Sequence, residues 1–145
     1  MQPDPVLIAN TSAWLRKATQ DLARAGHCLA GENSDAEDAL FHCQQAAEKA
    51  VKAFLTWHDQ PFRKTHDLAA LGKQCADIDP TLATLGERAD ELTEYAWAFR
   101  YPTSIAEPAP GEAEAARALA QQIVRDITSR LPASVRETTE LPASE

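Results

Sequence analysis

The sequence predicts an all-α protein, an antiparallel up-and-down helical bundle of about five helices. In five segments the apolar residues recur every three or four positions, which is the spacing of one helix face. Only 5 of the 145 residues are glycine and 6% are aromatic, too few for the turns and strands of a β-sandwich or barrel. We expect one domain over residues 1–131 and a flexible C-terminal tail over residues 132–145, where large apolar residues are scarce.

The first two predicted helices are long. The first covers residues 11–30, ends at Gly31 and carries one apolar stripe, formed by Leu15, Ala18, Leu22, Ala25 and Leu29. The second covers residues 35–58 and begins with a capping box of Ser34 and Glu37. It carries two apolar stripes, and this is more apolar surface than a single neighbouring helix can cover. We therefore expect it to pack against several helices and, across a two-fold axis, against a second copy of the chain.

Three further helices follow the second one. Thr65 is expected to cap the third. Asp79 followed by Pro80 predicts the start of a fourth helix, because Asp is a good capping residue and Pro is favoured at the first helical position. This helix should continue to about residue 100, where Pro102 stops it. The fifth predicted helix covers residues 112–131.

Composition narrows the possible partners. The formal net charge of −8 argues against general binding of duplex nucleic acid, and we expect no specific DNA binding. No apolar run approaches the roughly 18 residues of a membrane span, and the first residues lack the basic region of a signal peptide, so a cytoplasmic location is expected. Cys28, Cys43 and Cys75 form no CxxC pair and fall in helical patterns, which favours reduced core thiols over a metal or redox site. We expect no metal and no cofactor.

One stretch of this acidic chain is basic. Residues 49–73 carry five basic side chains (Lys49, Lys52, Arg63, Lys64 and Lys73) against two aspartates, a local net charge of +3. A discrete basic patch suits a phosphate or nucleotide better than a long duplex. The alternative is an ordinary solvated helix face with a polar turn.

His66, Asp67, Arg100 and Tyr101 are further candidates with ordinary alternatives. His66 and Asp67 stand where the third helix begins, a position that can hold an anion, but Asp67 there is also a good dipole partner. His66 is either a general acid or base, or a structural hydrogen bonder. Arg100 can cap the last carbonyls of its helix, and Tyr101 beside Pro102 can simply fix a loop.

The order of three short motifs is more specific than any one of them. Residues 44–53 read QQAAEKAVKA, residues 65–68 read THDL and residues 100–102 read RYP. This ordered set resembles the HEPN family (higher eukaryote and prokaryote nucleotide-binding domain). The resemblance implies a five-helix bundle that commonly dimerises and is often encoded beside a minimal nucleotidyltransferase. It also implies a fold similar to the substrate-binding half of nucleotidyltransferases.

Some HEPN proteins are metal-independent ribonuclease toxins, and this chain departs from their pattern. Their motif is Arg, four to six residues, then His on a late helix, whereas no His follows His66 here. Metal-free RNA cleavage needs a base and a cation held together. Arg63 or Arg100 could supply the cation for His66 only if folding or dimerisation brings them together.

Three functional hypotheses follow. The first, which we favour, is a non-catalytic module that binds a nucleotide or RNA phosphate, forms a homodimer and works with a nucleotidyltransferase in a toxin–antitoxin-like pair. Its ligand-binding residues would be Lys49, Lys52, Arg63, His66, Asp67, Arg100 and Tyr101. The second is a ribonuclease toxin with His66 as the candidate catalytic residue. The third is a ligand-free interaction protein in which Glu48 and Lys49 or Lys52 pair with Arg100 or Asp67 across helices.

Overall fold

The computed structural model describes residues 3–32, 34–102 and 106–139, and every regular element in these residues is a helix. The elements, in chain order, are α1 (Pro5–Leu29), α2 (Ala36–Trp57), α3 (Leu68–Ile78), the 3₁₀ helix η1 (Pro80–Leu82), α4 (Ala83–Ala89), the 3₁₀ helix η2 (Asp90–Ala96), α5 (Glu112–Thr128) and α6 (Ala133–Thr139). The predicted all-α helical bundle is confirmed. None of the helices in the described ranges is long and apolar enough to cross a membrane.

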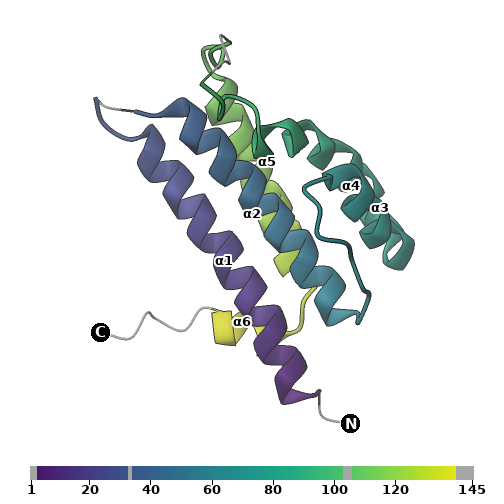
Figure 1. Cartoon of the computed structure of the whole chain (residues 1–145). Coiled ribbons are helices and arrows are strands. Elements are labelled where there is room, and N and C mark those ends of the chain that lie inside the picture. Colours follow the sequence, from purple (N-terminus) through teal and green to yellow (C-terminus); the bar gives the residue numbers. More distant parts are fainter. Residues whose placement is uncertain (1–2, 33, 103–105, 140–145) are drawn as a thin grey trace.

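Helix α2 is the centre of the bundle (Figure 1). It forms a hairpin with α1, and α5, α3 and η2 pack on its other sides. Both of its apolar stripes are buried in this way, from Ala39 and Leu40 near its start to Phe54 and Leu55 near its end. Within the described part of the chain, α2 therefore has no free apolar stripe for a second copy, so the physical reason for the predicted α2 pairing across a two-fold axis is removed.

Helix α1 begins earlier than the sequence pattern predicts. The Asp4 carboxylate accepts a hydrogen bond from the Val6 backbone N–H at 2.9 Å, and Pro5 occupies the first helical position. This is the same Asp–Pro start that the sequence predicts correctly at Asp79, whose carboxylate accepts from the Thr81 N–H at 3.0 Å. The apolar stripe of α1 begins only after the first two turns, which is why periodicity alone places the start too late.

The predicted flexible tail differs from the structure over residues 133–139, which form α6. Val135 on this helix is fully buried, and its carbonyl oxygen accepts a hydrogen bond from the Ser12 hydroxyl of α1 at 3.3 Å. Helix α6 packs on α1 through this one large apolar side chain, too little to produce an apolar period in the sequence. The rest of the predicted tail, residues 140–145, lies outside the described residues.

Helix α3 runs in the same direction as α2, because the loop over residues 58–67 returns along α2 (Figure 1). Gln44, in the first half of α2, donates to the backbone oxygen of His66 just before α3, at 3.3 Å. Further along both helices, the Cys75 thiol lies 3.8 Å from the Val51 carbonyl oxygen. The loop thus carries the start of α3 back to the middle of the bundle.

The predicted continuous fourth helix is divided into η1, α4 and η2. The reason lies in which side chains are buried: Ala89, Leu92 and Tyr95 face the core at a spacing of three. A 3₁₀ helix aligns every third residue, whereas an α-helix would rotate Tyr95 away from the other two. The turn structure of η2 therefore follows from burial of Tyr95.

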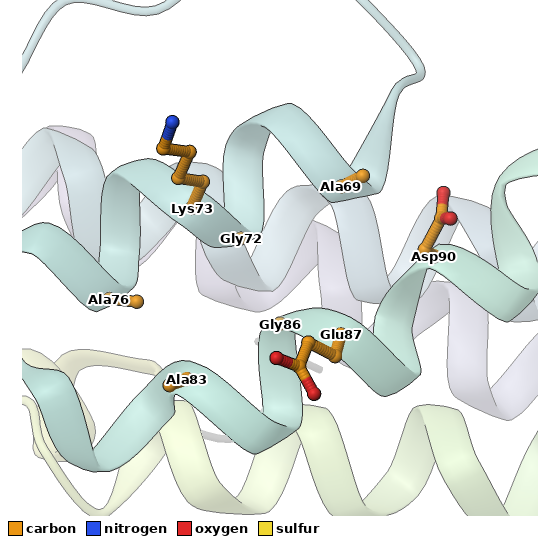
Figure 2. A pocket seen from close by; sticks show the side chains of 8 residues that line it. All are labelled: Ala69, Gly72, Lys73, Ala76, Ala83, Gly86, Glu87 and Asp90. Atoms are coloured by element: carbon orange, nitrogen blue, oxygen red, sulfur yellow. The ribbon is translucent and has the colours of Figure 1, made fainter.

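Helices α3 and α4 touch through two glycines. Gly72 and Gly86 face each other between the helices, as Figure 2 shows, and a Cβ atom built on Gly72 would lie 2.7 Å from the Gly86 Cα. Real Cβ atoms essentially never approach a backbone atom this closely, so only glycine permits the contact. A groove of about 530 Å³ remains at the surface of this pair, with Lys73 on one rim and Glu87 on the other.

We predict that Gly72→Ala destabilises the fold by about 1–3 kcal/mol, because the added methyl group forces two backbones apart. A matched control is Gly26→Ala in α1, where the atoms nearest to the new Cβ belong to the Arg117 side chain, the first at 3.0 Å, rather than to a backbone. That change should cost less than Gly72→Ala, because a side chain can shift by a few tenths of an ångström and alanine is the better helix former. Urea unfolding followed by circular dichroism measures both, and equal stability of the two variants would contradict the backbone contact.

Candidate functional site

The site is built around Glu48, a buried carboxylate on α2. Gln44, Glu48 and Lys52 are spaced by four residues and so lie on one face of the helix. The Lys52 ammonium donates to Glu48 Oε2 at 2.9 Å, and the Gln44 amide donates to Oε1 at 3.1 Å. The returning loop adds His66, whose Nδ1 lies 2.7 Å from Glu48 Oε1. The QQAAEKAVKA and THDL motifs thus meet at this carboxylate.

Glu48 fixes the orientation of the His66 ring. Because an ionised carboxylate only accepts hydrogen bonds, the 2.7 Å contact assigns the proton to His66 Nδ1. The side chain of His66 remains 55% exposed, so part of the ring is accessible to a ligand while Nδ1 is held by Glu48. A histidine oriented by a carboxylate in this way can donate to, or accept from, a group at the surface.

Opposing effects act on the pKa of Glu48. Burial alone would raise the pKa, but the hydrogen bonds from Lys52, His66 and Gln44 together outweigh burial and hold it below its ordinary value of 4.5. Glu48 is therefore ionised at neutral pH. Its charge is compensated mainly by Lys52, because the two groups are buried together.

The ammonium groups of Lys49 and Lys52 both contact side chains of the protein itself. Lys52 is buried, and its Nζ lies 5.6 Å from the ring centroids of Trp14 and of Phe62 in addition to its ion pair with Glu48. Lys49 Nζ donates to the buried carboxylate of Asp21 on α1. These two lysines, which the sequence predicts to contact a ligand, have partners in α1 and α2.

Arg100 lies against the start of α2. Its guanidinium carbon is 3.9 Å from the ring centroid of Phe41, and its Nη1 is 3.8 Å from the Asp38 carboxylate. The side chain is 45% exposed, and the neighbouring Tyr101 is 65% exposed. The His66 ring contacts Glu48, which follows Phe41 by seven residues, or about two turns of α2. Arg100 and His66 therefore contact the same helix about two turns apart, and the RYP motif joins the other two.

Arg63 and Asp67 lie at the edge of this region. Arg63 is exposed in the returning loop, beside an open groove of about 540 Å³ that is also lined by Phe62, Thr65 and Asp67. Asp67 rather than Thr65 is the N-cap of α3: its carboxylate accepts from the backbone N–H groups of Ala69 and Ala70 at 3.0 and 3.3 Å. The Thr65 hydroxyl accepts from the Asp67 N–H at 3.0 Å.

Ion pairs predicted for a ligand-free protein form with different partners. Glu48 pairs with Lys52 and His66, Lys49 with Asp21, and Arg100 with Asp38. Two buried members of these networks, Asp21 and Gln44, are absent from the predicted site. Gln44 could have been found from its spacing of four residues from Glu48, but nothing in the sequence links Asp21 to Lys49, 28 residues further on.

The three cysteines are free, and Cys43 and Cys75 are buried. Burial raises the pKa of each of these two thiols to about 12, so they are protonated and unreactive at neutral pH. The half-buried Cys28 thiol donates to Asp38 Oδ2 at 3.5 Å. In the described residues, no three His, Cys, Asp or Glu side chains come together as a metal site would require.

Comparison with protein families matches the HEPN domain over residues 11–131. This covers most of the chain, and all three motifs lie within it. The protein belongs to the HEPN domain family, whose members form nucleotide- or RNA-binding modules. Neither the curated proteins nor the solved structures contain a match to this chain.

We predict that Glu48→Gln lowers the free energy of unfolding at neutral pH by about 3–5 kcal/mol, because it leaves the buried Lys52 charge uncompensated. The folded-state pKa of Glu48 is depressed. The ionised carboxylate therefore stabilises the fold fully above pH 4.5, and this contribution disappears as the pH falls through the folded-state pKa.

The difference in stability between wild type and Glu48→Gln should therefore shrink on acidification below about pH 4.5. Urea unfolding at neutral pH and at several lower pH values measures it. Glu87→Gln, which changes an exposed carboxylate on α4, is the control and should alter stability by less than about 0.5 kcal/mol. If the difference in free energy of unfolding between wild type and Glu48→Gln stays constant with pH, this role of Glu48 is excluded.

Proposed function

We propose that this HEPN protein is a non-catalytic module that binds the phosphate of a nucleotide or of RNA at the surface between His66 and Arg100. One observation carries the proposal: these two side chains, from separate motifs, are about half exposed and contact the same helix, His66 at Glu48 and Arg100 at Phe41, about two turns apart. Each is fixed from beneath, His66 by Glu48 and Arg100 by the Phe41 ring.

The chemistry of these groups suits a phosphate. Arg100 presents a planar fork of donors that matches phosphate oxygens, and its exposed contact with Asp38 contributes at most about 1 kcal/mol, so a ligand can displace it. Protonated His66 can donate from Nε2 to the same anion. In this proposal Arg63 adds charge from the loop, and Asp67 and Tyr101 border the site. Lys49 and Lys52 act through the ion pairs that hold α2 in place.

We predict that AMP, ATP or a short single-stranded RNA raises the melting temperature of the wild type. Ligand at a hundred times its Kd adds about 2.7 kcal/mol to stability. His66→Ala and Arg100→Ala should each weaken binding at least tenfold in calorimetry, whereas Lys73→Ala, which removes an exposed cation from the α3 surface, should bind like the wild type. Variants that only melt at lower temperature, in a protein that gives no binding heat, would favour the ligand-free interaction protein.

The contact between Glu48 and His66 also favours the second hypothesis, a metal-independent ribonuclease. A histidine whose Nδ1 is held by a carboxylate is oriented to move protons at Nε2, and Arg63 or Arg100 would stabilise the phosphorane. The same RNA samples distinguish the two hypotheses. RNA that keeps its length after incubation supports the binding module, and cleavage that is lost in His66→Ala supports the ribonuclease.

We further propose that the protein is a cytoplasmic homodimer that works with a minimal nucleotidyltransferase, as in a toxin–antitoxin pair. Membership of the HEPN family supports this, and the dimer would use a surface other than the buried stripes of α2. Light scattering of the purified protein should give twice the chain mass of 15.8 kDa. Co-expression with a nucleotidyltransferase encoded beside it should give a stable complex, and a monomer that binds no such subunit would contradict the proposal.

A further inference from the structure

The turn over residues 97–101 exposes aromatic side chains on both sides of Arg100. Trp97 is 49% exposed and Tyr101 is 65% exposed. Among the described residues, Val6 is the one other large hydrophobic side chain that is similarly exposed, and it lies at the far end of α1. The two most exposed aromatic side chains of the described chain thus flank the arginine of the proposed phosphate site.

This turn is held in a costly backbone conformation. The Arg100 N–H donates to the Trp97 carbonyl at 3.2 Å and closes the turn, while Phe99 between them has a φ of 65°, a region that bulky residues rarely occupy. The Phe99 ring stacks on the Tyr95 ring, with 6.4 Å between the ring centroids. The Tyr95 hydroxyl donates to the Glu112 carboxylate on α5 at 2.6 Å. Phe99 therefore anchors the turn from the inside and leaves Trp97 and Tyr101 at the surface.

Exposed aromatic rings beside an arginine match an unpaired nucleotide. Bases stack on Trp and Tyr when their faces are free, and a duplex hides those faces. The exposed Asp90, Glu91 and Glu94 on η2 precede this turn in the chain, and their negative charge disfavours a long phosphate chain nearby. A short ligand, with one base and its phosphate, avoids this repulsion.

We propose that Trp97 and Tyr101 bind the unpaired base of a nucleotide, either free or in a short single strand, whose phosphate is held by Arg100 and His66. This inference rests on the proposed phosphate site and adds the part of the ligand that the aromatic turn recognises. It distinguishes a nucleotide from a phosphorylated sugar and a single strand from a duplex.

The test compares AMP with ribose 5-phosphate, which lacks the base, by calorimetry. AMP should bind the wild type about tenfold or more tightly than ribose 5-phosphate, since each stacked base contributes strongly to affinity. Trp97→Ala should reduce AMP affinity to the level of ribose 5-phosphate and leave ribose 5-phosphate binding unchanged. Tyr101→Ala should reduce AMP affinity in the same way, and Tyr101→Phe should restore it. Val6→Ala, which removes a similarly exposed apolar side chain elsewhere, should change neither affinity.

A short single-stranded RNA and the duplex of the same sequence complete the experiment, and the single strand should bind at least tenfold more tightly. If AMP and ribose 5-phosphate bind with equal affinity, and Arg100→Ala loses both, the proposed base stacking is wrong and the proposed phosphate site is supported. Loss of ribose 5-phosphate binding in Trp97→Ala would also overturn it, because the turn would then only position Arg100. A dimer that dissociates in Trp97→Ala with unchanged AMP affinity would identify the turn as a contact between copies. No binding of any of these ligands would reject the phosphate site itself.

Discussion

The Glu48 carboxylate is the constraint on which much of this structure depends. A charge taken out of water costs several kcal/mol unless partners compensate for it, and Glu48 obtains those partners from α2 itself and from the loop before α3. The loop over residues 58–67 has no helix of its own, and this polar contact fixes its path together with the contact of Phe62 with Trp14 and the hydrogen bond from Gln74 to the Pro61 oxygen. Because α3 starts where the loop ends, the same carboxylate orients the His66 ring and helps to set the direction of α3.

A second buried carboxylate sets the register between α1 and α2. The facing sides of this hairpin are rich in small residues such as Ala18, Ala25 and Ala46, which permit close packing but look alike from one turn to the next. Asp21 on α1 contacts both His42 and Lys49 on α2, at positions seven residues apart. Sliding the helices by one turn would leave that carboxylate buried without its partners, so the ion pairs specify an alignment that the alanines alone do not.

Local patterns predicted the long helices and the order of the motifs, but not the long-range contacts. The stripes of α1 and α2 and the Asp79–Pro80 start are visible in the sequence because each depends on residues within one or two turns. The change from the α-helix α4 to the 3₁₀ helix η2 depends on burial of Tyr95 in the core, and the position of α6 depends on the contact of Val135 with α1. Such contacts join distant parts of the chain, and the same applies to the site. His66 and Arg100 were candidates from their motifs, whereas the role of Glu48 in holding His66 depends on the returning loop.

The packing of α6 on α1 has a consequence for how the chain folds during synthesis. Ser12 and Val135, which meet through a hydrogen bond, are 123 residues apart. During translation the α1–α2 hairpin can form early, since its contacts are local, but the face of α1 that receives α6 stays open to water until residues 133–139 have left the ribosome. For that period the nascent protein exposes the side of α1 around Ser12 that α6 later covers, and this is the surface that a chaperone would meet.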